Sequence, residues 1–232
     1  MLAVEALKVA YGAAQVVFDV SFTVGDGEVV TLLGRNGVGK TTTISSIMGL
    51  VPPSGGRVAF NGAPLAGLPP FRVAQLGLGL VPEGRQIFPL LSVEENLVAT
   101  AAARFGPPRW SLKDIYAMFP SLAERCRNIG NQLSGGEQQM LAIGRSLMTN
   151  PKLLILDEAT EGLAPLIRNE IWSSLKHLKA EGQAILLVDK HIDALLKFAD
   201  RHVVIEKGCT VWSGTSPELA AAAKVRQRYL QV

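Results

Sequence analysis

The 232-residue chain is long enough for one large domain, or for a core carrying one inserted subdomain, and either would bury a substantial hydrophobic core. Hydrophobic residues make up 48% of the chain. Its purely apolar runs are nevertheless far shorter than the ~18 residues that span a bilayer, which argues against a membrane-crossing segment. The net charge of +3 comes from 23 basic and 20 acidic residues without a block of either sign, so binding to nucleic acid is not indicated.

The first ten residues do not resemble a signal peptide, because Glu5 and Lys8 interrupt them with charge and no long apolar run follows. We therefore expect a cytoplasmic protein. Cys126 and Cys209 lie far apart without CxxC spacing, so neither a zinc site nor a disulfide framework is predicted.

The N-terminal part of the chain is expected to form a sheet. Short apolar runs predict strands at 3–9, 16–24 and 28–33, with turns at Gly12 and around Gly25. The third strand leads directly into a glycine-rich loop, and a helix is predicted after it at 42–50. The local order is therefore strand, glycine loop, helix.

The middle of the chain has a helical pattern between residues 84 and 150. A capping box formed by Ser92 and Glu95 precedes a helix expected over 96–104, and apolar residues at helical spacing predict another over 134–148. Short strands are predicted before this stretch, at 57–60 and 78–81.

The apolar runs 153–156 and 184–188, separated by a helix predicted over 167–180, are typical of buried parallel strands. We therefore predict an α/β fold with an antiparallel β part. Residues 1–83 and 151–232 would form its core, and 84–150 an inserted helical subdomain.

The loop 34–41 matches the pattern G-x-x-x-x-G-K-[ST] in the strand–helix context that distinguishes a phosphate loop from a chance match. Glycines let backbone N–H groups surround phosphates, and the helix N-terminus favours negative charge. Lys40 would add a positive charge and the Thr41 hydroxyl could bind Mg²⁺. The competing interpretation, a glycine turn before a helix, does not account for lysine and threonine in register.

Asp157 and Glu158 follow a buried strand, where open α/β sheets place their ligand sites. Asp157 would hold Mg²⁺, directly or through water. Glu158 could orient or deprotonate the water that attacks the γ-phosphate. Taken alone, the pair could equally mark a strand that leaves the core for solvent.

Residues 133–137, Leu-Ser-Gly-Gly-Glu, open the helix predicted to end near 148, and we call them the signature segment. Ser134 and Glu137 have the spacing of a capping box, so a well-capped helix is one sufficient explanation. Two successive glycines weaken a helix, however, and are expected where backbone N–H groups approach something closely. An anion is the natural candidate.

The phosphate loop, the signature segment and the Asp157–Glu158 pair together resemble an ATP-binding cassette (ABC) ATPase, a P-loop NTPase, over nearly the whole chain. The resemblance implies a dimer in which Ser134, Gly135 and Gly136 face the γ-phosphate held by the other subunit. It implies ATP and Mg²⁺ as ligands. The phosphate loop would bind the nucleotide through Gly34, Arg35, Asn36, Gly37, Val38, Gly39, Lys40, Thr41 and Thr42.

The same resemblance assigns further roles. Tyr11 would stack on adenine, although a strand-end tyrosine is a serious alternative. Thr41, Asp157 and Glu83 would bind the metal, Glu83 at a position where most members carry glutamine. The partners implied are membrane permeases, a substrate-binding protein acting indirectly, and a second ATPase subunit, identical or a sister chain. The protein would then lie on the inner face of the cell membrane.

Residues 81–85, Val-Pro-Glu-Gly-Arg, and 162–165, Gly-Leu-Ala-Pro, resemble the ATPases of branched-chain amino-acid uptake systems. The chain departs from that subfamily at Ala159 and Glu161, where proline and leucine are usual. Two other classes of protein fit the sequence less well. A P-loop kinase would lack the signature segment, and a soluble cassette ATPase acting on DNA or the ribosome would normally show a long coiled coil or a second cassette.

The family usually places a switch residue, most often histidine, two positions past the strand that ends at Val188. That count reaches Lys190, and so does counting ten positions back from Asp200. His191 lies one residue further on. A lysine there could donate to the γ-phosphate as a flexible charge. We therefore predict that Lys190 senses the γ-phosphate and that His191 is a surface residue at a helix start.

Overall fold

The computed structural model describes residues 1–230. Its strands form one sheet in the order β5-β4-β1-β2-β10-β9-β3-β8-β7-β6. The strands are β1 (Leu2–Tyr11), β2 (Ala14–Val24), β3 (Val29–Leu33), β4 (Gly55–Phe60), β5 (Ala63–Pro64), β6 (Leu78–Val81), β7 (Leu153–Asp157), β8 (Ala184–Val188), β9 (Arg201–Glu206) and β10 (Cys209–Thr215).

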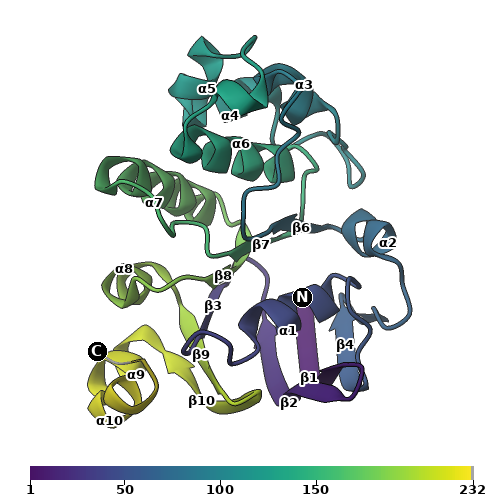
Figure 1. Ribbon diagram of the computed structural model, residues 1–232, viewed down its shortest axis with the longest axis vertical. Coiled ribbons are helices and arrows are strands. Elements are labelled where there is room, and N and C mark those ends of the chain that lie inside the picture. The colour runs from purple at the N-terminus through teal and green to yellow at the C-terminus, as the bar shows by residue number, and fades with distance from the viewer. Residues whose placement is uncertain (231–232) are drawn as a thin grey trace.

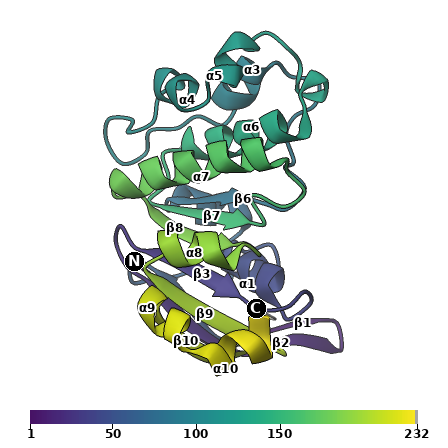
Figure 2. The ribbon, with the colours of Figure 1, turned by 90° about the vertical axis from the view of Figure 1, so that its left-hand side faces the viewer.

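Helices cover both faces of this sheet (Figures 1 and 2). They are α1 (Lys40–Ile47), α2 (Pro70–Gln75), α3 (Val93–Val98), α4 (Leu112–Met118), α5 (Pro120–Glu124), α6 (Gly135–Leu147), α7 (Pro165–Ala180), α8 (Ile192–Phe198), α9 (Ser216–Ala221) and α10 (Ala223–Val225), with a 3-10 turn η1 (Gly130–Gln132) and a π-helical turn η2 (Arg226–Leu230). None of the helices within residues 1–230 has the length and apolar composition that crossing a membrane requires.

The sheet has a parallel and an antiparallel part. Strands β3, β8, β7 and β6 pair in parallel, and β3, β7 and β8 are buried along their whole length. Strands β1, β2 and β4 pair antiparallel. The predicted α/β fold with an antiparallel β part is therefore confirmed.

Alternate residues of the parallel strands serve two separate hydrophobic cores. Leu154 and Leu156 of β7 join the cluster that contains residues of α3, α4, α6 and α7. Leu153 and Ile155 join the cluster that contains α1, β1 and β2. This alternation explains why the strand sequences are continuously apolar, since both faces are covered.

Helices α3 to α6 lie between β6 and β7 in the chain and gather at one end of the molecule (Figure 1). The Ser92–Glu95 capping box forms as predicted. The helix expected over 96–104 is too long, because α3 ends at Val98. The backbone N–H of Ala102 instead donates to the carbonyl oxygen of Met148 at 3.0 Å, which ties this stretch to the end of α6.

Candidate functional site

The carboxyl ends of β3, β8 and β7 meet at one edge of the sheet. Thr31 is in register with Leu187, and Val188 is in register with Asp157. The loops that follow these three strands hold the phosphate loop, Lys190 and Glu158. The parallel topology therefore gathers residues that are widely separated in sequence where open α/β sheets bind ligands.

The phosphate loop wraps around its own lysine. Lys40 is only 7% exposed, and its ammonium donates to the carbonyl oxygens of Gly34 and Arg35, both at 2.9 Å. Burial lowers the pKa of Lys40, whereas the nearby Asp157 carboxylate raises it. Gly34 has φ of 138°, and a Cβ atom there would lie 2.2 Å from the carbonyl oxygen of Ile205. Only glycine fits this position.

A cavity of about 400 Å³ opens in front of this loop. It brings together most of the residues that the sequence singled out, from the phosphate loop, the 81–85 segment, and the loops after β7 and β8. Its lining residues are Val16, Asn36, Gly37, Gly39, Lys40, Thr41, Thr42, Glu83, Glu158, Glu161 and Lys190.

Asp157 presents a carboxylate oxygen that lacks a partner. Its side chain is buried, and Oδ1 has no hydrogen-bond partner among the described residues. Burial raises the pKa of the Asp157 carboxyl and Glu83 raises it further, whereas the Thr41 hydroxyl and Lys40 act in the opposite direction. An unpaired buried carboxylate oxygen beside a hydroxyl fits a hard cation such as Mg²⁺.

Within residues 1–230 no three His, Cys, Asp or Glu side chains converge as a ready-made metal cluster.

Glu158 leaves β7 in an unusual backbone conformation. Its φ is 55°, which few non-glycine residues adopt, and its N–H donates to the carbonyl oxygen of Val188 at 2.9 Å. Lys190 Nζ lies 3.8 Å from Glu158 Oε1 and also pairs with Glu161. Glu161 departs from the branched-chain pattern and Lys190 from the histidine usual in the family, and here the two contact each other. Both are more than a third exposed, so this pair adds little stability.

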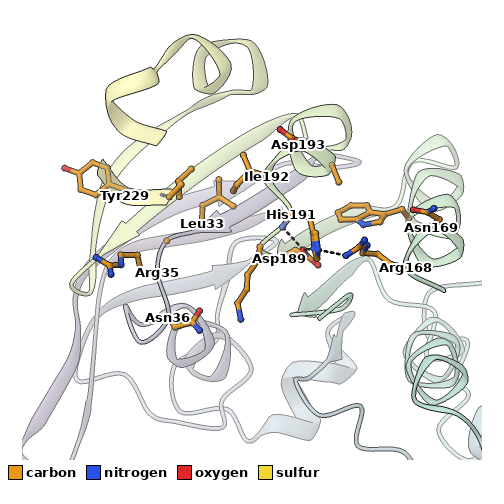
Figure 3. A pocket seen from close by; sticks show the side chains of 15 residues that line it. Leu33, Arg35, Asn36, Arg168, Asn169, Asp189, His191, Ile192, Asp193 and Tyr229 are labelled. Carbon is orange, nitrogen blue, oxygen red and sulfur yellow. Dashed lines mark hydrogen bonds and ion pairs between the residues drawn. The ribbon is translucent and has the colours of Figure 1, made fainter. Parts of the chain in front are cut away.

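His191 is held in a hydrogen-bonded network beside Lys190. Its ring contacts Asp189 and Arg168, as Figure 3 shows. It does not line the cavity in front of the phosphate loop. Both residues line neighbouring cavities, but of the two only Lys190 lines the cavity in front of the phosphate loop and pairs with Glu158.

The signature segment lies away from the phosphate loop of its own chain. It begins α6, which is separated from α1 along the long axis in both views (Figures 1 and 2). Ser134 Oγ accepts from the Glu137 N–H at 3.3 Å, and Glu137 Oε2 accepts from the Ser134 N–H at 2.7 Å, so the predicted capping box forms.

The glycines of the signature segment have a packing reason that the sequence did not reveal. A Cβ atom on Gly135 would lie 2.7 Å from Nη1 of Arg85, and one on Gly136 would lie 2.4 Å from Cγ2 of Ile167. Close packing therefore excludes a larger residue at Gly136, whether or not an anion approaches, whereas Gly135 is bordered only by the movable guanidinium of Arg85.

Tyr11 is one of the predicted site residues that do not line the cavity. It ends β1 and is 51% exposed, and the neighbouring strand contributes Val16 to the cavity instead. Its side chain is free to receive a flat ring, but within this chain it contacts none of the phosphate-loop residues by a hydrogen bond.

Three polar residues close to the site were not predicted from the sequence: Thr160, Arg168 and Asp189. Thr160 and Asp189 are buried and hydrogen-bonded to each other. One feature of the sequence could have indicated Asp189. It directly follows the buried strand β8, just as Glu158 directly follows the buried strand β7. Arg168 gave no signal, because a charged residue in the first turns of a helix is usually a solvated surface group.

Comparisons with known proteins agree with this geometry. The family model described as "ABC transporter" matches residues 17–161. The chain is 40% identical to the high-affinity branched-chain amino acid transport ATP-binding protein BraG of Pseudomonas aeruginosa, over 99% of both chains. It is 34% identical to the lipopolysaccharide export system ATP-binding protein LptB of Escherichia coli, over 99% of this chain and 96% of LptB.

Among solved structures, an ATP-binding subunit of an ABC transporter superposes with a TM-score of 0.83 at 30% identity, covering 100% of this chain and 96% of the other. The fold, the phosphate loop and the matched family model point to the same assignment. The chain is an ATP-binding subunit of the ABC transporter family, whose activity is ATP hydrolysis.

Proposed function

We propose that this subunit hydrolyses MgATP to energise the import of branched-chain or related hydrophobic amino acids through partner permeases. The observation that carries the proposal is the 40% identity to BraG across the full chain, against 34% to LptB. The 81–85 and 162–165 segments, which resemble those of branched-chain uptake ATPases, support the same cargo.

The residues at the cavity in front of the phosphate loop have distinct proposed roles. The loop 34–42 holds the phosphates through backbone N–H groups, with Lys40 as the fixed charge. Asp157, Thr41 and Glu83 would hold Mg²⁺, which neutralises phosphate charge when bound. Glu158 orients the attacking water.

Lys190 donates to the γ-phosphate when its contacts to Glu158 and Glu161 are exchanged for phosphate oxygens. Such an exchange is easy because both of these ion pairs are partly solvated.

The site is completed by a second subunit, identical or a sister ATPase. Ser134, Gly135 and Gly136 of one subunit face the γ-phosphate held by the other. The separation of α6 from α1 within one chain supports this arrangement, because the signature segment lines no part of its own phosphate cavity. Tyr11 stacks on adenine at the open edge of the site.

A groove of about 560 Å³ is the proposed docking site for the permease. It is lined by α2, β6, the ends of α1 and α6, and residues before and after α3, and it exposes Leu50, Phe71 and Phe88. Arg104 and Arg145 line it, and none of its lining residues is acidic. An apolar permease segment with an acidic residue fits this chemistry. Residues of both the proposed core, 1–83 with 151–232, and the proposed helical subdomain, 84–150, line the groove. Docking there would hold the subunit on the cytoplasmic face of the membrane.

Copurification tests the cargo and the partner together. Tagged wild-type chain from its native host should bring down permeases, and the reconstituted complex should raise its ATPase rate with leucine-loaded binding protein. Stimulation by lipopolysaccharide instead would overturn the import proposal. Phe71→Ser should lose the permeases while retaining ATP binding, whereas Val211→Ser, which replaces an exposed apolar residue outside the groove, should keep them.

A further inference from the structure

A buried carboxylate, Asp189, organises the loop after β8. Its Oδ2 accepts from the Thr160 hydroxyl at 2.5 Å, and its Oδ1 accepts from the His191 backbone N–H at 3.0 Å and from the His191 ring at 2.7 Å. Both oxygens are therefore used by donors on two different loops. A buried carboxylate bonded in this way holds its neighbours in one arrangement, because leaving any donor unpaired is costly.

The second ring nitrogen of His191 meets an arginine. Nη1 of Arg168 lies 2.7 Å from His191 Nε2, and both side chains line the same 880 Å³ cavity (Figure 3). Arginine can only donate, so Nε2 must accept and Nδ1 must carry the proton that goes to Asp189. The partners on both sides therefore fix the tautomer and the orientation of the imidazole.

This network joins three segments that surround the proposed catalytic residues. Thr160 belongs to the loop that begins at Glu158, Arg168 belongs to the first turns of α7, and His191 begins α8, accepting from the Leu195 N–H through its carbonyl oxygen at 3.0 Å. Lys190 stands between Asp189 and His191, so its backbone is held on both sides. Its side chain reaches Glu158 from that fixed base.

We propose that His191 is a positioning residue for ATP hydrolysis. Through Asp189 and Arg168 it fixes the backbone from which Lys190 reaches the γ-phosphate, and it does not touch the nucleotide itself. The inference rests on the role of Lys190 in the proposed function. It explains why a histidine stands next to the switch position and yet does not line the cavity that holds Lys40 and Glu158.

A double-mutant cycle on the purified chain tests this inference, with steady-state hydrolysis of MgATP as the readout. His191→Ala should lower kcat by about 10- to 100-fold, the loss expected when a reacting group is displaced by up to about 1 Å, with KM unchanged. Lys190→Ala should lower kcat further. In the Lys190→Ala background, His191→Ala should cause no additional loss, because its effect passes through Lys190.

Two further variants test whether the loss of kcat could come from misfolding or from removing any histidine. His191→Asn keeps a donor for Asp189 but cannot reach Arg168, so it should fold and still lower kcat. His177→Ala, which removes an exposed histidine from α7, should keep the wild-type kcat.

The alternative results are separable. Equal losses from His191→Ala in both backgrounds, or a change in melting temperature with kcat unchanged, would overturn the positioning role while leaving Lys190 in place. Wild-type kcat in Lys190→Ala would instead remove Lys190 from the proposed mechanism, and the inference with it.

Discussion

Gly136, in the first turn of α6, leaves no room for a methyl group. A Cβ atom there would lie 2.4 Å from Cγ2 and 3.1 Å from Cγ1 of Ile167 on α7. Isoleucine in a helix has one strongly preferred rotamer, so it cannot swing aside cheaply. Overpacking costs about 1–3 kcal/mol, and alanine recovers at most about 1 kcal/mol of helix propensity. We expect Gly136→Ala to lower the free energy of unfolding by about 1–2 kcal/mol.

Urea unfolding followed by circular dichroism measures this loss, and Gly135 provides the matched control. A Cβ atom on Gly135 would meet only the guanidinium end of Arg85, which can move, so Gly135→Ala should be at least as stable as wild type, by up to about 1 kcal/mol of helix propensity. Ile167→Ala should make the Gly136→Ala substitution harmless when the two are combined. Wild-type stability in Gly136→Ala, or no relief from Ile167→Ala, would refute the packing argument.

Three other predictions concern the site and the core. Gly135→Asp should bind ATP but fail to dimerise in size-exclusion chromatography, because its carboxylate would face phosphate; dimerisation at wild-type strength would rule out the two-subunit site. Asp157→Asn should make ATP affinity insensitive to Mg²⁺ in a titration with and without EDTA, and an unchanged Mg²⁺ dependence would count against Asp157 as a ligand. Burial lowers the pKa of His202 from 6.5 to about 4, so as the pH falls the unfolded chain takes up this proton before the folded chain does. The free energy of unfolding should therefore fall by about 3 kcal/mol as the pH is lowered from 6.5 to 4. In His202→Asn this part of the pH dependence should be absent from the urea midpoints.

Much of the fold could be predicted from local pattern. Continuous apolar runs such as 153–156 predicted buried strands, because strands covered on both faces need no polar residues. The C-terminal strands β9 and β10 were not predicted. Residues 201–206 read Arg-His-Val-Val-Ile-Glu, and His202 is buried only because Thr31 and Ser216 hydrogen-bond to its two ring nitrogens. Such partners come from distant parts of the chain and leave no local signal.

The candidate site could be predicted where a motif fixes geometry, as in the phosphate loop. Local pattern is not sufficient where direction depends on a single residue step. For the adjacent Lys190 and His191, the spacing typical of the family predicted Lys190, and Lys190 does line the cavity. Local pattern cannot separate the two, because successive side chains of an extended segment point to opposite sides. The contact of Lys190 with Glu161 was likewise hidden, since the two are 29 residues apart.

The most direct test of the two-subunit mechanism is the oligomeric state of Glu158→Gln in MgATP, measured by size-exclusion chromatography with light scattering beside Lys40→Ala. Glu158 acts on the attacking water, so its amide variant should keep wild-type ATP affinity, lose nearly all turnover and accumulate as an ATP-bound dimer. Lys40→Ala should bind ATP weakly and stay monomeric. A monomeric Glu158→Gln at saturating MgATP, or equal loss of ATP affinity in both variants, would contradict the account.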